Sequence, residues 1–316
     1  MELRHLEVLV AVAETGTVTA AGQRLGTVQS AVSATLRALE EEVGAELFTR
    51  TARRAVLTEA GQAMLPDARA ALAGAERARA AVRESQEGLR GHLAVGTMTS
   101  LQVLDLPRLL GRLHRSHPGV SVGLSAHPGG SAGLVEAVAA GTLDLAFVSI
   151  PGVPPPGVRL RAVARVPLRP LVPRGHRLAG ATSVSLADLA GERWVDSPAG
   201  FGNRAAVDAA LARSGLVRTV ALEVMDVTAM PDYVAAGLGV AAVPEMVPID
   251  VTEVSAPALR GPPVFWPLAV ATAAGRPERA VVRAFLAQIP AELKAMAPAY
   301  RLGDGGPAPR PALPAR

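Results

Sequence analysis

The stretch "TVQSAVSATLRALEEEVG", residues 27–44, predicts one helix with two unlike faces. Thr27 suits an N-cap, and Gly44 suits the position just past the last turn. Apolar residues at helical spacing predict a buried face made of Val32, Leu36, Leu39 and Val43. The segment therefore has capping signals at both ends and one apolar face that is expected to pack in a hydrophobic core.

The opposite face of this helix is polar but small in its first half. It carries Gln29, Ser33 and Arg37 at intervals of four, with Ser30 and Ala34 beside them. A helix that enters the major groove must be slim and must offer hydrogen-bonding groups to base edges near its N-terminal end. Glutamine can pair with adenine, and serine hydroxyls can reach bases or phosphates. We therefore interpret this face as a DNA-reading surface; an ordinary solvated face is the alternative.

The residues around this helix predict a helix-turn-helix and a basic hairpin. One helix ends at Gly16, and a second, short helix from about Thr19 to Leu25 follows the capping residue Thr17. After the third helix, "LFTRTARRAVLTEAG" (47–61) predicts two brief strands. Their basic tip carries phosphate-binding candidates, namely Arg50, Arg53 and Arg54. A solubilising turn is the alternative interpretation of these arginines.

Composition limits the classes of protein that the chain can be. With 316 residues, 49% hydrophobic and 19% charged, it is long enough for two or three globular domains. It has no cysteine for a disulfide or thiolate site, and its six histidines show no metal-ligand spacing. The glycine-rich stretches lack a dinucleotide-binding fingerprint, so we expect no enzyme, cofactor or metal. Neither a membrane span nor a secretory signal is found, which favours a cytoplasmic protein.

Net charge alone does not decide whether the partner is DNA. The chain is formally +4, yet residues 1–60 hold six arginines against eight glutamates. Nucleic-acid binding is therefore argued from where the charges lie.

A long helix is predicted from the capping residue Thr58 to about Leu89, with Pro66 expected to kink it. Its heptad positions are Met64, Ala68, Ala71, Ala75, Ala78, Val82, Ser85 and Leu89. We interpret this seam as a self-pairing dimer helix. The alternative is an alanine-rich spacer that packs on its own chain.

From Gly91 onward, apolar strands alternate with helices. "HLAVGTMTS" (92–100), "VSVGLSAH" (120–127) and "LDLAFVSI" (143–150) predict strands of a largely parallel sheet covered on both faces. "VAAGTLDLAFV" from Val138 and "VAAGLGVAAVP" from Val234 suggest two lobes with one plan. The Pro-rich residues 151–158 predict a loop, and the Pro/Gly-rich tail 303–316 predicts disorder.

The run "LEVLVAVAETGTVTAAGQRLGTVQSAVSATLRALEEEVGAELFTRTARRAVLTEAG" (6–61) resembles the N-terminal domain of LysR-type transcriptional regulators. The likeness continues more loosely through the long helix to "YVAAGLGVAAVP" (233–244). It implies an α/β protein with a winged helix-turn-helix, a linker helix and a two-lobed effector domain like type 2 periplasmic binding proteins. It also implies a dimer or tetramer that binds promoter DNA and responds to a small molecule. Many members carry Arg at Ala34 and Pro at Ser30, so the operator sequence stays open.

The resemblance also points to residues and boundaries. The expected DNA contacts are Thr27, Gln29, Ser30, Ser33, Arg37, Arg50, Arg53 and Arg54. The expected effector contacts, between lobes, are Thr99, Ser100, Gly130, Ser131, Phe147, Gly202 and Asn203. Hydroxyls and helix-start amides donate hydrogen bonds, so they suit an anion such as an organic acid. The expected segments are a DNA-binding domain 1–58, a linker helix 59–90, an effector domain 91–302 and the tail 303–316; lobe I is about 91–163 with 267–302, and lobe II about 164–266.

We therefore predict a sequence-specific DNA-binding transcription regulator gated by a small ligand. The alternative is a cytoplasmic small-molecule-binding or enzymatic α/β protein whose N-terminal helices only mediate dimerisation. The sequence names neither the effector, the operator nor the target genes. It also leaves open activation against repression, and dimer against tetramer.

Overall fold

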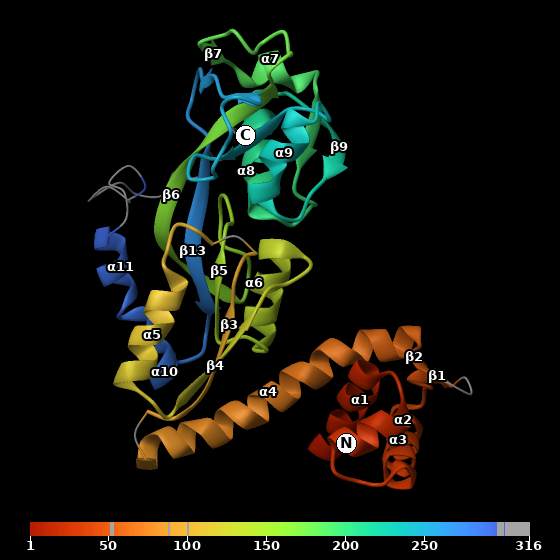
Figure 1. Cartoon of the computed structure of the whole chain (residues 1–316). Coiled ribbons are helices and arrows are strands. Elements are labelled where there is room, and N and C mark those ends of the chain that lie inside the picture. Colours follow the sequence, from red (N-terminus) through yellow and green to blue (C-terminus); the bar gives the residue numbers. More distant parts are fainter. Residues whose placement is uncertain (51–53, 88, 100, 296–299, 301–316) are drawn as a thin grey trace, which may run out of the picture. The chain divides into compact units, whose positions relative to one another are not determined.

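The computed structural model describes the chain apart from residues 51–53, 88, 100, 296–299 and 301–316 (Figure 1). The predicted tail therefore lies outside the described residues, as do Ser100 and Arg53. The chain forms two compact units, Met1–Gly88 with Ala140–Thr142, and Leu89–Ala139 with Leu143–Arg316. None of the described helices combines the length and apolarity needed to cross a membrane.

The first unit is a helix-turn-helix followed by a two-stranded hairpin and a long helix, as predicted (Figure 1). Its elements are α1 Leu3–Thr15, α2 Val18–Arg24, α3 Gln29–Val43, β1 Phe48–Arg50, β2 Ala55–Leu57 and α4 Glu59–Glu87. The apolar stripes of α1 and α3 meet in one core with residues at the entry to the hairpin. Val32, Leu36 and Leu39 are fully buried there, which confirms these three residues of the predicted inner face of α3. The prediction of Val43 as a buried residue is wrong, because it is 40% exposed in the last turn of the helix.

The helix ends follow the capping signals with one exception. α1 ends at Gly16 (φ 72°), α3 ends at Gly44 (φ 69°), and the Thr17 hydroxyl accepts a hydrogen bond from a backbone amide of α2. The prediction of Thr27 as the N-cap of α3 is wrong, because Val28 holds that position and no side chain caps the helix. Thr27 belongs to the preceding turn, where its amide donates to the Gly22 carbonyl at 2.9 Å.

The first part of α4 packs its alanine-rich seam on its own chain, and pairing of this helix with a second copy stays a prediction. Its start is capped as predicted, because the Gly61 amide donates to the Thr58 hydroxyl at 3.1 Å. Ala68 is buried in the core of the first unit and Met64 packs against it, so this part of the seam covers its own chain. Val82, further along, is 58% exposed. The helix is continuous through Pro66.

The second unit is a mixed α/β structure. Its main sheet has the strand order β10-β6-β13-β5-β3-β4, with β11 paired to β6. Those strands are β3 Gly91–Gly96, β4 Val120–Ser125, β5 Leu145–Val148, β6 Val158–Pro173, β10 Ala241–Pro244, β11 Val254–Ser255 and β13 Phe265–Ala273. The helices are α5 Leu106–Ser116, α6 Gly130–Ala140, α7 Leu186–Ala190, α8 Gly202–Arg213, η1 Val227–Ala229, α9 Met230–Ala235, α10 Ala280–Leu286 and α11 Ile289–Ala295. Small parallel pairs join β7 Ser183–Val184 to β12 Ala258–Leu259, and β8 Arg193–Asp196 to β9 Thr219–Glu223.

The prediction of a largely parallel sheet is wrong at the centre of this sheet. β3 is parallel to β4 and β5, but β13 runs antiparallel to β5 and β6, and β10 antiparallel to β6. The first half of β6 pairs with β13 and the second half with β10 and β11, so these two long strands join two lobes (Figure 1). The alternation of strand-like and helix-like segments does not reveal the direction of β13, because its partners β5 and β6 lie far away in the sequence.

The two lobes repeat one local plan, as the sequence echo predicts. α6 leads through Gly141 (φ 80°) into β5, and α9 leads through Gly237 (φ 78°) towards β10.

Both faces of β5 are buried. Leu145 and Phe147 join the core with α5 and α10, whereas Ala146 and Val148 pack with α6.

Candidate functional site

The outer face of α3 is accessible, which the DNA-reading interpretation requires. Gln29 and Ser30 are exposed and Ser33 is half-buried, while the opposite face of the helix fills the core. The Gln29 amide nitrogen donates to the Ser33 hydroxyl at 3.0 Å. This bond joins neighbouring turns of the helix and orients the glutamine amide. Ala34 and Arg37 continue the same exposed surface.

The start of α3 and the hairpin supply groups suited to phosphates. No side chain caps the first turn of α3, so its backbone amides and the positive end of the helix dipole face outward. The predicted two-stranded hairpin is present, and it pairs Phe48 with Leu57 and Arg50 with Ala55. Arg54 is exposed at its tip. The side chain of Arg50 and the whole of Arg53 lie outside the described residues.

The second unit contains a pocket where strand ends and helix starts of both lobes meet. Its volume is about 50 Å³, which is room for a few water molecules. It is lined by Thr97, Met98, Thr99, Ala126, His127, Gly130, Ser131, Leu134, Ser197, Phe201, Gly202, Asn203, Met225, Val227 and Trp266. Residues after the carboxyl ends of β3, β4 and β8 contribute, and α6 and α8 begin at this point.

Most of the predicted effector residues come together in this pocket. The structure brings together Thr99, Gly130, Ser131, Gly202 and Asn203. Phe147 is a correction, because its ring is fully buried and packs edge-on against Phe285 at 6.3 Å between ring centroids. The alternation of side chains along β5 turns it to the face opposite α6.

The polar groups around the pocket are not all available to a ligand. Both hydrogen bonds from the Asn203 amide nitrogen are used, at 2.8 Å to Asp196 and 3.0 Å to the Ala242 carbonyl. The Ser131 hydroxyl accepts from the Ser149 amide at 3.0 Å and keeps its own proton to donate. No side chain caps α8. The Ser131 hydroxyl can therefore still donate to a ligand, whereas the Asn203 side-chain nitrogen is committed to the wall of the pocket.

His127 is a pocket residue that the sequence analysis did not single out. It is the one titratable side chain among the lining residues in the described part of the chain. The Gly129 amide donates to His127 Nδ1 at 3.0 Å, so a neutral ring carries its hydrogen on Nε2 as a donor. Gly133 makes room for the ring, since a Cβ there would lie 1.9 Å from Nδ1. The available signal was a histidine directly after the carboxyl end of a strand.

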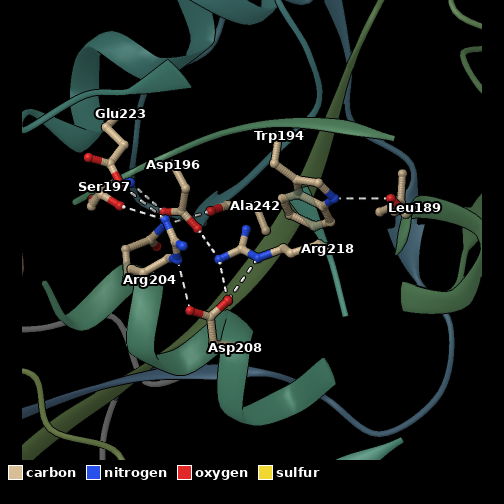
Figure 2. Close-up of polar contacts among 10 residues, drawn as sticks. Leu189, Trp194, Asp196, Ser197, Arg204, Asp208, Arg218, Glu223 and Ala242 are labelled. Atoms are coloured by element: carbon tan, nitrogen blue, oxygen red, sulfur yellow. Dashed lines mark hydrogen bonds and ion pairs between the residues drawn. The ribbon is translucent and has the colours of Figure 1, made fainter. Parts of the chain in front are cut away.

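Asp196, Arg218 and Asp208 form a charge network that adjoins the pocket residue Ser197 (Figure 2). Arg218 donates to Asp196 at 2.5 Å and to Asp208 at 2.9 Å, and its guanidinium lies 4.5 Å from the centre of the Trp194 ring. The side chains of Asp196 and Arg218 are 1% and 2% exposed. Burial raises the pKa of the Asp196 carboxyl, whereas Arg218 and the Asn203 and Ser197 donors act against that rise.

The network fixes two pocket residues to the lobe that carries β8. Asp196 accepts from the Asn203 side chain and from the Ser197 amide at 2.6 Å, and both residues line the pocket. The carboxylate therefore joins the end of β8 to the start of α8. Neither member of the pair was predicted from the sequence, because Asp196 and Arg218 are 22 residues apart and each looks like a surface charge.

Comparisons with known proteins agree with this architecture. The family "Bacterial regulatory helix-turn-helix protein, lysR family" matches residues 3–62, and "LysR substrate binding domain" matches residues 86–294. HTH-type transcriptional regulator ShiR of Corynebacterium glutamicum (strain R) is 35% identical over 246 residues, 76% of this chain and 82% of that protein. The RuBisCO operon transcriptional regulator of Allochromatium vinosum is 33% identical over 246 residues, 77% and 79% of the two chains.

Solved structures give the same result across nearly the whole chain. The crystal structure of CbnR, a LysR family transcriptional regulator, superposes with a TM-score of 0.65 at 26% identity, covering 93% of this chain and 99% of that one. Full-length CbnR complexed with its target DNA superposes with a TM-score of 0.64 at 27% identity, covering 94% and 100%.

A helix-turn-helix unit and a two-lobed binding unit with a pocket together define a transcription regulator. The chain belongs to the LysR family of bacterial regulators.

Proposed function

We propose that this regulator binds promoter DNA through α3 and the hairpin, and that a small anionic effector in the pocket changes that binding. The hydrogen bond between the exposed Gln29 and the half-buried Ser33 carries the DNA part of the proposal, since it presents an oriented amide on a slim helix face. Arg54 and the neighbouring Arg50 and Arg53 are the proposed phosphate contacts. The related CbnR is known in complex with its target DNA, which supports the same mode here.

The effector part rests on the donors around the pocket. The Ser131 hydroxyl, the start of α8 and the Nε2 hydrogen of a neutral His127 favour an acceptor-rich group such as a carboxylate. The volume of about 50 Å³ favours a small acid. Binding in a pocket lined by both lobes would shift the balance between conformations of the second unit.

The remaining assignments follow from this role. We propose a dimer or tetramer that pairs through the part of α4 that carries the exposed Val82, a cytoplasmic location and no enzymatic activity. Paired helices would read two half-sites one helical turn or more apart. Support comes from the relatives, which are transcriptional regulators.

Fluorescence anisotropy with the full chain and the DNA upstream of its own gene tests the DNA proposal. The expected result is binding that outcompetes random duplex DNA. Equal affinity for both DNAs would contradict sequence-specific reading. A thermal-shift screen with acetate, oxalate and succinate tests the pocket, because a ligand stabilises the native state in proportion to occupancy.

A further inference from the structure

Glu40 lies near the end of α3, and its side chain holds the entry to the hairpin. One carboxylate oxygen accepts from the Leu47 amide at 2.9 Å and from the Phe48 amide at 3.3 Å. Leu47 and Phe48 are 1% and 2% exposed, and Phe48 is the first residue of β1. The carboxylate therefore serves two backbone donors at the point where the chain turns into the hairpin.

Other hydrogen bonds attach the hairpin to different parts of the unit. The Thr58 hydroxyl donates to the Glu46 carbonyl at 2.7 Å, and the Ala55 amide donates to the Gly16 carbonyl at 2.8 Å. These bonds tie the hairpin to the start of α4 and the end of α1. Among the described residues, the Glu40 carboxylate provides the hydrogen bonds that attach the hairpin to α3.

Through Glu40, the rigid helix α3 is connected to the hairpin, which is the other proposed DNA-binding element. Gln29 and Glu40 lie on the same helix, about 16 Å apart along its axis at 1.5 Å per residue. A side chain at one end faces bases in the proposed mode, while the carboxylate at the other end sets the position of β1. DNA contacts from α3 and from the hairpin arginines require that these two elements keep a fixed spacing.

We propose that Glu40 is a positioning residue for DNA binding: it holds the hairpin at the spacing from α3 that lets both contact one duplex. This inference rests on the proposed function. For a variant that lacks the Glu40 carboxylate, it predicts weaker DNA binding, whereas simple electrostatics predicts stronger binding. Removing a negative charge from a DNA-binding surface should strengthen binding, whereas releasing the hairpin should weaken it.

The test compares variants of the full chain on a fluorescein-labelled random-sequence duplex, by anisotropy over a range of salt concentrations. Glu40→Ala should weaken binding about eightfold at 0.1 M salt for each phosphate that the hairpin no longer neutralises, and should lower the salt slope by about one to three. Alanine is a strong helix former, so α3 should persist. Glu40→Gln keeps an acceptor oxygen and should bind within about twofold of the wild type.

Glu41→Ala is the matched control, because it removes the same charge from the next, exposed residue. It should bind as tightly as the wild type or tighter. Glu40→Ala that binds like Glu41→Ala would overturn the inference. If Glu40→Ala fails to fold, Glu40→Asp decides: it keeps the charge but shortens the reach, and wild-type binding and salt slope in it would overturn the inference equally. A wild-type chain that binds no DNA would instead refute the proposed function.

Discussion

The buried pair of Asp196 and Arg218 allows a quantitative prediction about the second unit. Arg218→Met removes the cation but keeps an apolar stem beside Trp194, so a buried carboxylate loses its charged partner. Breaking one side of a buried ion pair costs about 3–5 kcal/mol. For a unit of this size that corresponds to a fall in Tm of about 6–20 °C.

Urea unfolding followed by tryptophan emission measures this cost directly. The chain has two tryptophans, and both Trp194 and Trp266 are buried in the second unit. The signal therefore reports that unit alone in the full-length protein. Asp196→Asn with Arg218→Met should be less destabilised than the sum of the single variants, by about 0.5–3 kcal/mol. Strict additivity, or a cost below about 1 kcal/mol for Arg218→Met, would refute the reasoning.

The pH dependence of Arg218→Met should have a definite sign. Burial raises the pKa of Asp196 in the folded state, and loss of the guanidinium removes a group that acts against that rise. The native state then binds a proton more tightly than the unfolded state, so stability falls as pH rises from the unfolded value of about 3.9 through the raised pKa. The deficit against the wild type should therefore shrink as pH is lowered through the raised pKa of Asp196 towards the unfolded value. Adding Asp196→Asn should abolish this narrowing.

Three other substitutions test the proposed sites. Gln29→Ala should cost about 1–3 kcal/mol on the preferred operator and little on random DNA, as measured by anisotropy. Arg53→Ala should weaken binding to every sequence and lower the salt slope by about one; an unchanged slope would remove it from the phosphate contacts. Gly133→Ala should displace the His127 ring, since its Cβ would lie 1.9 Å from Nδ1. It should therefore reduce any thermal shift produced by small carboxylates without changing DNA binding in their absence.

The first unit was predictable because its signals are local. Capping residues, glycines and 3.6-residue periodicity act within a few positions, and they placed α1, α2, α3 and the hairpin correctly. The prediction of Thr27 as the N-cap of α3 was wrong for a local reason as well. A close turn at Gly22, where a Cβ would come 2.9 Å from the Thr27 carbonyl, takes that residue out of the helix start.

The second unit was less predictable because its decisive features are non-local. "LDLAFVSI" predicts a strand, but both faces of β5 are buried, so nothing in the run tells which way Phe147 points. The direction of β6 and β13 depends on partners far away in the sequence. Asn203 was placed correctly among the pocket residues, but the sequence did not reveal that Asp196 and the Ala242 carbonyl accept both hydrogen bonds from its side-chain nitrogen.

Acidic residues show most clearly that residue type alone does not predict which side chains make structural contacts. They also indicate that helical position could improve such a prediction. Glu40, Glu41 and Glu42 are three identical residues in a row, and residue type alone does not distinguish them. Only the first is drawn towards the core, because it follows the buried Leu39 and lies one turn beyond Leu36, whereas the next two are exposed. Helical phase therefore separates Glu40, which can organise backbone amides of the chain that follows, from the exposed Glu41 and from Glu42, whose carboxylate pairs instead with the N-terminal amine of Met1 and with His5. Asp196 follows the same logic at the end of a strand, where a buried carboxylate holds the wall of a pocket.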